Sequence, residues 1–306
     1  MLPRIALHPT HGPELSRLVY GVWRLADASD TSSKHVREKI DACLAQGITS
    51  FDHADIYGDY TCEQVFGQAL AADPGLRQRI ELISKCDIAL ISDKYPNRRV
   101  KYYDTSAAYI QGQVEQSLKH LHTDYLDCLL IHRPDPFMDA RETGAALDAL
   151  ISQGKVRSVG VSNFAPWDFD LLQSAMQNPL VTNQLEMSVL QRDVFTNGAL
   201  AQSQRLGIRP MAWSPLAGGE LFSSNNAAAQ RVMPVLQRLA QAQEADNIAV
   251  EHIALAWLLA HPAGIIPVVG TNNMARIQQL HAAMSVSLER EDWFEIWTAA
   301  AGQEVP

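Results

Sequence analysis

Eight short apolar segments, separated by longer segments with helical periodicity, constrain the fold of this chain most strongly. The longer segments carry apolar residues three or four positions apart, as helices with one buried face do. Strands that alternate with helices in this way predict a parallel sheet with right-handed crossovers. The expected strands occupy residues 17–22, 48–51, 80–84, 127–131, 156–161, 181–186, 208–213 and 265–270.

Eight parallel strands are the number that closes into a (β/α)8 TIM barrel filled by side chains. We therefore predict an α/β protein with a single barrel domain over residues 1–306. In residues 4–18 two apolar pieces flank a His-Gly-Pro turn, which predicts an N-terminal β-hairpin across the barrel floor. Asp30 is the expected cap of the first helix, and the aromatic-rich tail from Ser287 predicts an extra C-terminal helix.

Charge and composition exclude several classes of function. The formal net charge of −9 opposes the basic surface expected of a nucleic-acid-binding protein. No apolar signal segment opens the chain, and Glu251, His252 and His261 interrupt its most apolar stretch, so neither export nor membrane insertion is expected. The four cysteines form no CxxC pair, which fits reduced thiols in a cytoplasmic protein. The sequence makes no prediction of oligomeric state.

Polar and titratable side chains follow the expected strands. In a barrel of this kind the active site lies at the carboxyl ends of the strands, so these side chains are expected to converge on one rim. They are Trp23, Asp52, Tyr57, Lys85, His132, Ser162, Asn163, Gln184, Trp213, Ser214 and Thr271.

Four of these residues together suit proton transfer to a carbonyl oxygen. A tyrosine has a pKa of about 10, and a nearby ammonium such as that of Lys85 is expected to lower the pKa of Tyr57. Asp52 would keep the lysine charged and in place. A neutral His132 could hydrogen-bond the carbonyl oxygen and receive its developing charge. The group therefore predicts carbonyl reduction.

Two other chemistries use the same residues. Asp52, His53 and Asp55 are ligand types for zinc or iron, but Asp52 and His53 would point to opposite faces of an extended strand. We therefore predict no metal site. Lys85 could form a Schiff base, as in aldolases with a barrel fold, only if its pKa were depressed, and Asp52 opposes that depression.

The cofactor-binding residues are expected in the second half of the chain. The chain has neither the GxGxxG nor the GxxxxGK[ST] phosphate-binding motif. "GVSNF" (160–164) and "NQLEMS" (183–188) offer amides and hydroxyls to a carboxamide, and Trp213 offers a flat stacking face. "SPLAGGEL" (214–221) and "GTNNMARI" (270–277) provide small residues and Arg276 for phosphates.

The order and wording of these motifs resemble the aldo-keto reductase superfamily over essentially the whole chain, and most closely a branch of bacterial oxidoreductases. The stretch "RSVGVSNF" (157–164) fits a signature of that superfamily at every position. The other matching stretches, in the expected order, are "FDHADIYG", "SKCD", "LLIHRPD", "NQLE" and "AWSPL".

The resemblance implies an NADPH-dependent oxidoreductase that reduces a small aldehyde or ketone, with a nucleotide-binding redox-sensing subunit as the alternative. It assigns Tyr57 as general acid, Asp52 and Lys85 as the pair tuning it, and His132 as the group orienting the carbonyl. It implies NADP(H) rather than NAD(H), because Arg276 fits a 2′-phosphate although Gly270 stands where many members have lysine. Trp23 and the segment 86–104, which is expected to be irregular, would line the substrate pocket. The implied cofactor-binding residues are Ser162, Asn163, Gln184, Trp213, Ser214, Leu216, Gly218, Thr271 and Arg276.

Overall fold

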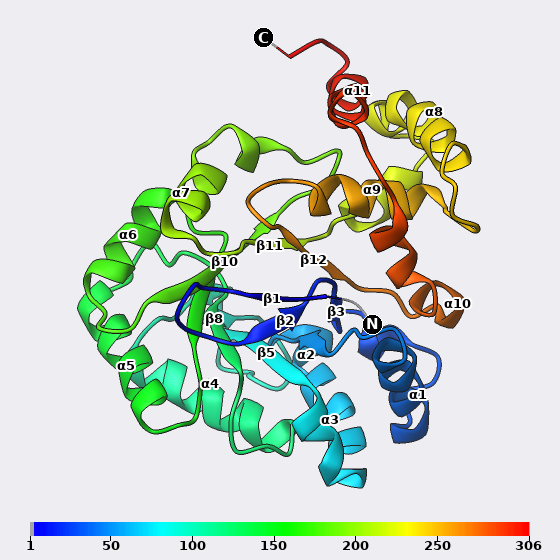
Figure 1. The fold of residues 1–306 in the computed structure, drawn as a ribbon. Helices are drawn as coiled ribbons and strands as arrows, with labels where there is room; N and C mark the ends of the chain where they lie inside the picture. The colour runs from blue at the N-terminus through cyan, green and yellow to red at the C-terminus, as the bar shows by residue number, and fades with distance from the viewer. Residues whose placement is uncertain (1–2, 306) are drawn as a thin grey trace.

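Eight parallel strands close into a barrel surrounded by helices in the computed structural model, which describes residues 3–305 (Figure 1). The order around the barrel is β10-β11-β12-β3-β4-β5-β8-β9, so the first and second halves of the chain meet at β12 and β3 and again at β8 and β9. All eight predicted strands are confirmed. They are β3 (Val19–Gly21), β4 (Ser50–Asp52), β5 (Glu81–Cys86), β8 (Cys128–Ile131), β9 (Val159–Ser162), β10 (Leu180–Glu186), β11 (Met211–Trp213) and β12 (Ile266–Val269).

Helices connect the strands and cover the outside of the barrel. The expected cap of the first helix is wrong by two residues, because Ser32 caps α1 by accepting a hydrogen bond from the His35 amide. Asp30 instead accepts from the Ser32 amide and so shapes the turn that precedes the helix. The α-helices are α1 (Ser33–Leu44), α2 (Tyr57–Tyr60), α3 (Cys62–Ala72), α4 (Ala107–His120), α5 (Ala140–Ser152), α6 (Pro166–Ser174), α7 (Ala199–Leu206), α8 (Ala227–Gln241), α9 (Val250–Leu259), α10 (Met274–Ile277) and α11 (Arg290–Ala301).

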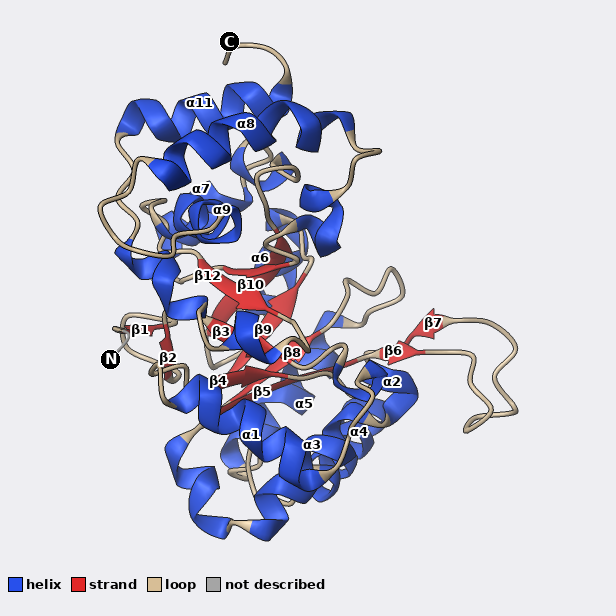
Figure 2. Cartoon of the chain, turned by 90° about the vertical axis from the view of Figure 1, so that its right-hand side faces the viewer, coloured by secondary structure: helices blue, strands red, loops and turns tan. Residues whose placement is uncertain are grey.

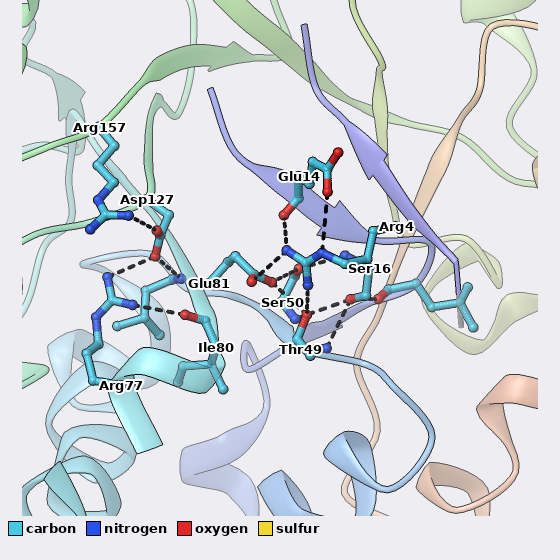
Figure 3. Close-up of polar contacts among 12 residues, drawn as sticks. Arg4, Glu14, Ser16, Thr49, Ser50, Arg77, Ile80, Glu81, Asp127 and Arg157 are labelled. Carbon is cyan, nitrogen blue, oxygen red and sulfur yellow. Dashed lines mark hydrogen bonds and ion pairs between the residues drawn. The ribbon is translucent and has the colours of Figure 1, made fainter. Parts of the chain in front are cut away.

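An N-terminal β-hairpin closes the barrel floor, as predicted. It consists of β1 (Arg4–Ala6) and β2 (Glu14–Ser16), and its buried Leu7 and Leu15 pack against the side chains that fill the barrel interior. Arg4 reaches the amino ends of two barrel strands, donating to Glu81 at 2.8 Å and to Thr49 at 2.8 Å (Figure 3). Apolar side chains and these polar contacts therefore seal the end of the barrel opposite the predicted site.

The predicted C-terminal helix, α11, is joined to helix α9 by stacked indoles. The rings of Trp257 and Trp293 lie 4.7 Å apart and almost parallel. Each indole N–H donates to the other residue's backbone oxygen at 3.0 Å, so the buried ring nitrogens are satisfied. The helix α11 also lies beside α8 (Figure 1).

Residues 86–104, expected to be irregular, contain a second antiparallel hairpin. Its strands are β6 (Ile88–Ala89) and β7 (Tyr102–Tyr103), and it follows β5 at the carboxyl end of the barrel. Figure 2 shows this β6–β7 hairpin projecting away from the helices around the barrel. No helix in residues 3–305 has the length and apolar character needed to cross a membrane.

A buried ion pair joins the amino ends of β5 and β8 near the floor. Arg77 donates to Asp127 at 2.8 Å, and the same carboxylate oxygen accepts the Leu82 amide at 2.9 Å (Figure 3). Arg157 lies 3.8 Å from the other carboxylate oxygen, but its side chain is 59% exposed. The contact that Asp127 makes with Arg77 is therefore the one shielded from water.

We predict that Asp127→Ala lowers the free energy of unfolding by about 3 kcal/mol, because it leaves the Arg77 charge buried without a partner. Urea denaturation monitored by circular dichroism measures this change. Arg157→Ala is the matched control, and it should cost less than about 1 kcal/mol because an exposed ion pair contributes little. Equal losses in the two variants would contradict this assignment.

Candidate active site

Strand alternation brings Asp52 and Lys85 together inside the barrel. Asp52 is the last residue of β4, whose register places it beside Ile83 of β5. Ile83 packs in the barrel interior, and Lys85, two residues further along the strand, points to the same side. The side chains of Asp52 and Lys85 are 2% and 0% exposed, so their charges lie almost entirely out of water.

The ammonium of Lys85 makes three polar contacts at the top of this interior. It donates to Asp52 Oδ2 at 2.6 Å, to the backbone oxygen of His53 at 2.7 Å and to Tyr57 Oη at 3.2 Å. Burial alone would lower the pKa of Lys85, but the Asp52 carboxylate and Tyr57 phenol outweigh it, and the pKa is raised. Lys85 therefore stays charged, which does not suit a Schiff-base nucleophile.

Tyr57 begins the short α2 segment, in which Gly58 adopts a positive φ of 59°. A side chain at position 58 would clash with Ala26 and Cys62, so glycine permits the turn that aims the phenol at Lys85. Burial raises the pKa of Tyr57 more than Lys85 lowers it, so the net shift is upward, contrary to the sequence-based expectation. The phenol consequently carries its proton at neutral pH.

His132 lies beside the Tyr57 ring. Its ring centroid is 5.9 Å from that of Tyr57, with the two planes nearly perpendicular. Burial and the positive charge of Lys85 hold the pKa of His132 well below its usual range, so the imidazole is neutral. His132 is 8% exposed and reaches the cavity, where a neutral ring nitrogen can donate to an oxygen atom.

A series of hydrogen bonds links Asp52 to the second half of the barrel. Gln184 donates to the other oxygen of Asp52 at 2.8 Å, and Ser162 donates to the backbone oxygen of Gln184 at 2.9 Å. The Asn163 amide then donates to Ser162 Oγ at 2.9 Å, and its carbonyl accepts the Trp213 indole N–H at 2.9 Å. The side chains predicted to meet the cofactor are thus fixed to the same carboxylate that holds Lys85.

These side chains surround a cavity of about 760 Å³ at the carboxyl end of the barrel. Every predicted site residue except Lys85 lines it, and Lys85 lies beneath its floor with no exposed surface. The predicted residues that line the cavity are Trp23, Asp52, Tyr57, His132, Ser162, Asn163, Gln184, Trp213, Ser214, Leu216, Gly218, Thr271 and Arg276.

One end of the cavity has an open wall formed by two adjacent glycines. Gly218 and Gly219 have φ of 64° and 107°, and no atom lies where their side chains would project. Arg24 spans the cavity from the end of β3 and donates to the Gly218 oxygen at 3.1 Å. Arg276 is exposed in the first turn of α10, and no carboxylate in residues 3–305 pairs with it.

Three lysine and arginine residues of the cavity wall were not predicted from the sequence: Arg24, Lys101 and Arg133. The positive charges of Lys101 and Arg133 both help to lower the pKa of His132. Neither residue forms an ion pair within the described chain. The position of Arg133 directly after His132 could have indicated it. Lys101 gave no such signal, because the β6–β7 hairpin that brings it to the cavity was expected to be irregular.

The residues considered as metal ligands, Asp52, His53 and Asp55, do not face one common site. The His53 ring packs edge-on against Phe66, with centroids 4.5 Å apart, whereas Asp52 faces Lys85. Burial lowers the pKa of His53 to about 3 and raises that of Asp55 well above its usual value. Within residues 3–305, no three His, Cys, Asp or Glu side chains are gathered as metal ligands. Asp59 is exposed.

A barrel with this set of residues at its carboxyl end is typical of oxidoreductases that act on carbonyl and alcohol groups. Residues 17–300 match the model of the aldo/keto reductase family. The chain belongs to that family.

Close relatives support this membership. The chain is 56% identical to a 6-dehydroglucose reductase from Agrobacterium fabrum, over 95% of this chain and 96% of the relative. It is 42% identical to the oxidoreductase YdhF of Escherichia coli over the full length of both, which confirms the predicted bacterial branch. Among solved structures, it resembles an aldo/keto reductase from Klebsiella pneumoniae in complex with NADP and acetate. That likeness has a TM-score of 0.75 and 24% identity, and covers 95% and 94% of the two chains.

Proposed function

We propose that this protein is an NADPH-dependent reductase that converts an aldehyde to a primary alcohol. The observation that carries the proposal is the placement of the Tyr57 hydroxyl, 3.2 Å from the buried Lys85 ammonium and beside the neutral His132 ring. These groups open onto a cavity large enough for a dinucleotide together with a small substrate.

The reaction divides between the bound nucleotide and the side chains. NADPH, when bound, supplies the hydride that reduces the carbonyl carbon. His132 donates a hydrogen bond to the carbonyl oxygen and orients it toward Tyr57. Tyr57 gives its proton to that oxygen, and the Lys85 charge stabilises the phenolate left behind. Asp52 keeps Lys85 charged and in position throughout.

The chain offers matching groups to each part of NADPH. The Ser162, Asn163 and Gln184 side chains can bind the nicotinamide carboxamide, and the Trp213 ring can stack on the nicotinamide. Ser214, Leu216 and Gly218 lie where the backbone can approach a pyrophosphate. Thr271 and the exposed guanidinium of Arg276 can bind the ribose and its 2′-phosphate, which favours NADPH over NADH.

The substrate we propose is a hydroxyl-rich aldehyde of the sugar type, such as 6-dehydroglucose. The relative that is 56% identical to this chain bears the name of that activity. The cavity agrees with such a substrate, because Lys101 and Arg133 line it, form no ion pair with a carboxylate of residues 3–305, and can donate hydrogen bonds to hydroxyl oxygens. Trp23 and Tyr103 supply aromatic surface for a sugar ring.

We predict that Tyr57→Phe lowers the turnover of carbonyl reduction at least about 100-fold, because the proton donor is removed while the ring remains. The dissociation constant for NADPH should stay within about twofold, because the lost hydroxyl is assigned to the substrate carbonyl rather than to the nucleotide. NADPH oxidation measures turnover, and nicotinamide fluorescence measures binding.

Tyr60→Phe is the matched control for this prediction. The Tyr60 hydroxyl accepts hydrogen bonds from Arg98 and the Leu90 amide and does not line the cavity. The same loss of a hydroxyl at position 60 should leave turnover within a few-fold of the wild-type value. Full activity in Tyr57→Phe would refute the proposed role of Tyr57.

The substrate class is tested by Lys101→Met. This variant should lower kcat/KM about tenfold for 6-dehydroglucose, since a charged donor to a hydroxyl is lost, and leave kcat/KM for benzaldehyde unchanged. Lys94→Met is the control from the same hairpin, because the Lys94 ammonium bonds the Asp59 backbone oxygen instead of facing the cavity. An equal loss for both aldehydes would argue against recognition of substrate hydroxyls.

A further inference from the structure

Asp87, which neither the family assignment nor the proposed reaction uses, has a strained backbone beside the site. It directly follows β5, the strand of Lys85, and its φ is +113°. A residue with a side chain rarely adopts this conformation, and it persists only where surrounding contacts enforce it. Such strain is concentrated at functional positions, so the contacts of Asp87 are informative.

These contacts join two segments that wall the cavity. Asp87 Oδ2 accepts the backbone N–H of Arg133 at 3.0 Å, and the Asp87 backbone oxygen accepts the Asp104 N–H at 2.8 Å. The first contact holds the residue that directly follows His132. The second holds the base of the β6–β7 hairpin, which carries Lys101 to the cavity.

The Asp87 side chain is completely buried and does not itself line the cavity. Its second oxygen, Oδ1, has no hydrogen-bond partner among the described residues. Burial and the nearby carboxyl groups of Asp55 and Asp135 raise its pKa well above the usual range. What this side chain supplies to Arg133 is an acceptor oxygen for the backbone N–H.

The backbone hydrogen bond of the preceding residue, His132, does not replace the contact between Asp87 and Arg133. The His132 amide donates to the Cys86 backbone oxygen at 3.0 Å, continuing the pairing of β5 with β8 by one residue. Beyond that point the chain leaves the sheet, and the Arg133 amide would have no strand partner. The Asp87 carboxyl takes that amide and fixes the direction in which the chain leaves β8.

We propose that Asp87 is a positioning residue that sets the orientation of His132 and Arg133 toward the substrate. It acts through the Arg133 backbone and touches no reacting atom. In this strained conformation the Asp87 backbone oxygen meets the Asp104 N–H while the Asp87 side chain reaches the Arg133 N–H. The expected changes in kcat and KM rest on the proposed carbonyl reduction. The expected change in the orientation of His132 does not.

Two substitutions separate positioning from folding. Asp87→Gly removes the acceptor and relieves the backbone strain, because glycine adopts a φ of +113° readily. Asp87→Asn keeps a carbonyl oxygen at the position of Oδ2 and has nearly the same volume. Binding of NADPH, measured by nicotinamide fluorescence, reports whether the cavity of each variant is correctly folded.

We expect Asp87→Gly to lower kcat for 6-dehydroglucose at least about tenfold and to raise KM, while the NADPH dissociation constant stays within about twofold. Asp87→Asn should keep kcat and KM within about threefold of wild type. The imidazole resonances of His132 in 15N-histidine-labelled protein, identified by their loss in His132→Gln, should shift in Asp87→Gly and not in Asp87→Asn.

Wild-type kinetics in Asp87→Gly together with an unmoved His132 resonance would overturn the inference. Equal losses in Asp87→Gly and Asp87→Asn, with NADPH binding intact, would overturn it as well, because a kept acceptor would then not suffice. If the wild-type protein reduced no aldehyde, the proposed function would fail, and the His132 resonance alone would decide the role of Asp87.

Discussion

The ion pair between Lys85 and Asp52 is the interaction on which the rest of the site depends. Two charges shielded this fully from water are tolerated only when they are paired and their remaining polar atoms are hydrogen-bonded. The His53 backbone oxygen and Tyr57 complete the contacts of Lys85, and Gln184 occupies the second oxygen of Asp52. Because these partners come from β4, β5, β10 and the α2 turn, the closed barrel is what makes the pair possible.

The same ion pair connects the two chemical tasks proposed for the cavity. On one side the Lys85 charge meets the phenol of Tyr57, where we place proton transfer. On the other side the hydrogen bonds from Asp52 continue through Gln184, Ser162 and Asn163 to Trp213, where we place the nicotinamide. A rigid connection of this kind fixes a proton donor relative to a hydride donor, which is what reduction of a carbonyl requires.

The sequence predicted the barrel and its rim well, because strand alternation and strand ends are local features of a sequence. All eight strands were located, and the predicted site residues gather around one cavity or lie directly beneath it. Features set by tertiary surroundings were missed. Desolvation raises the pKa of Tyr57 against the expected effect of Lys85, and the β6–β7 hairpin that carries Lys101 has no pattern distinguishable from an irregular loop. Ser32 rather than Asp30 caps α1, since both residues can cap and only the turn geometry decides.

The central claim is that the buried ammonium acts on the carbonyl through the phenol rather than independently of it. A double-mutant cycle with Tyr57→Phe and Lys85→Met tests it most directly, with single-turnover oxidation of bound NADPH by an aldehyde as the measured rate. Both single variants should be strongly impaired, and the double variant should be no slower than the slower single variant, since Lys85 has no role once the phenol is gone. Losses that multiply in the double variant would contradict the account.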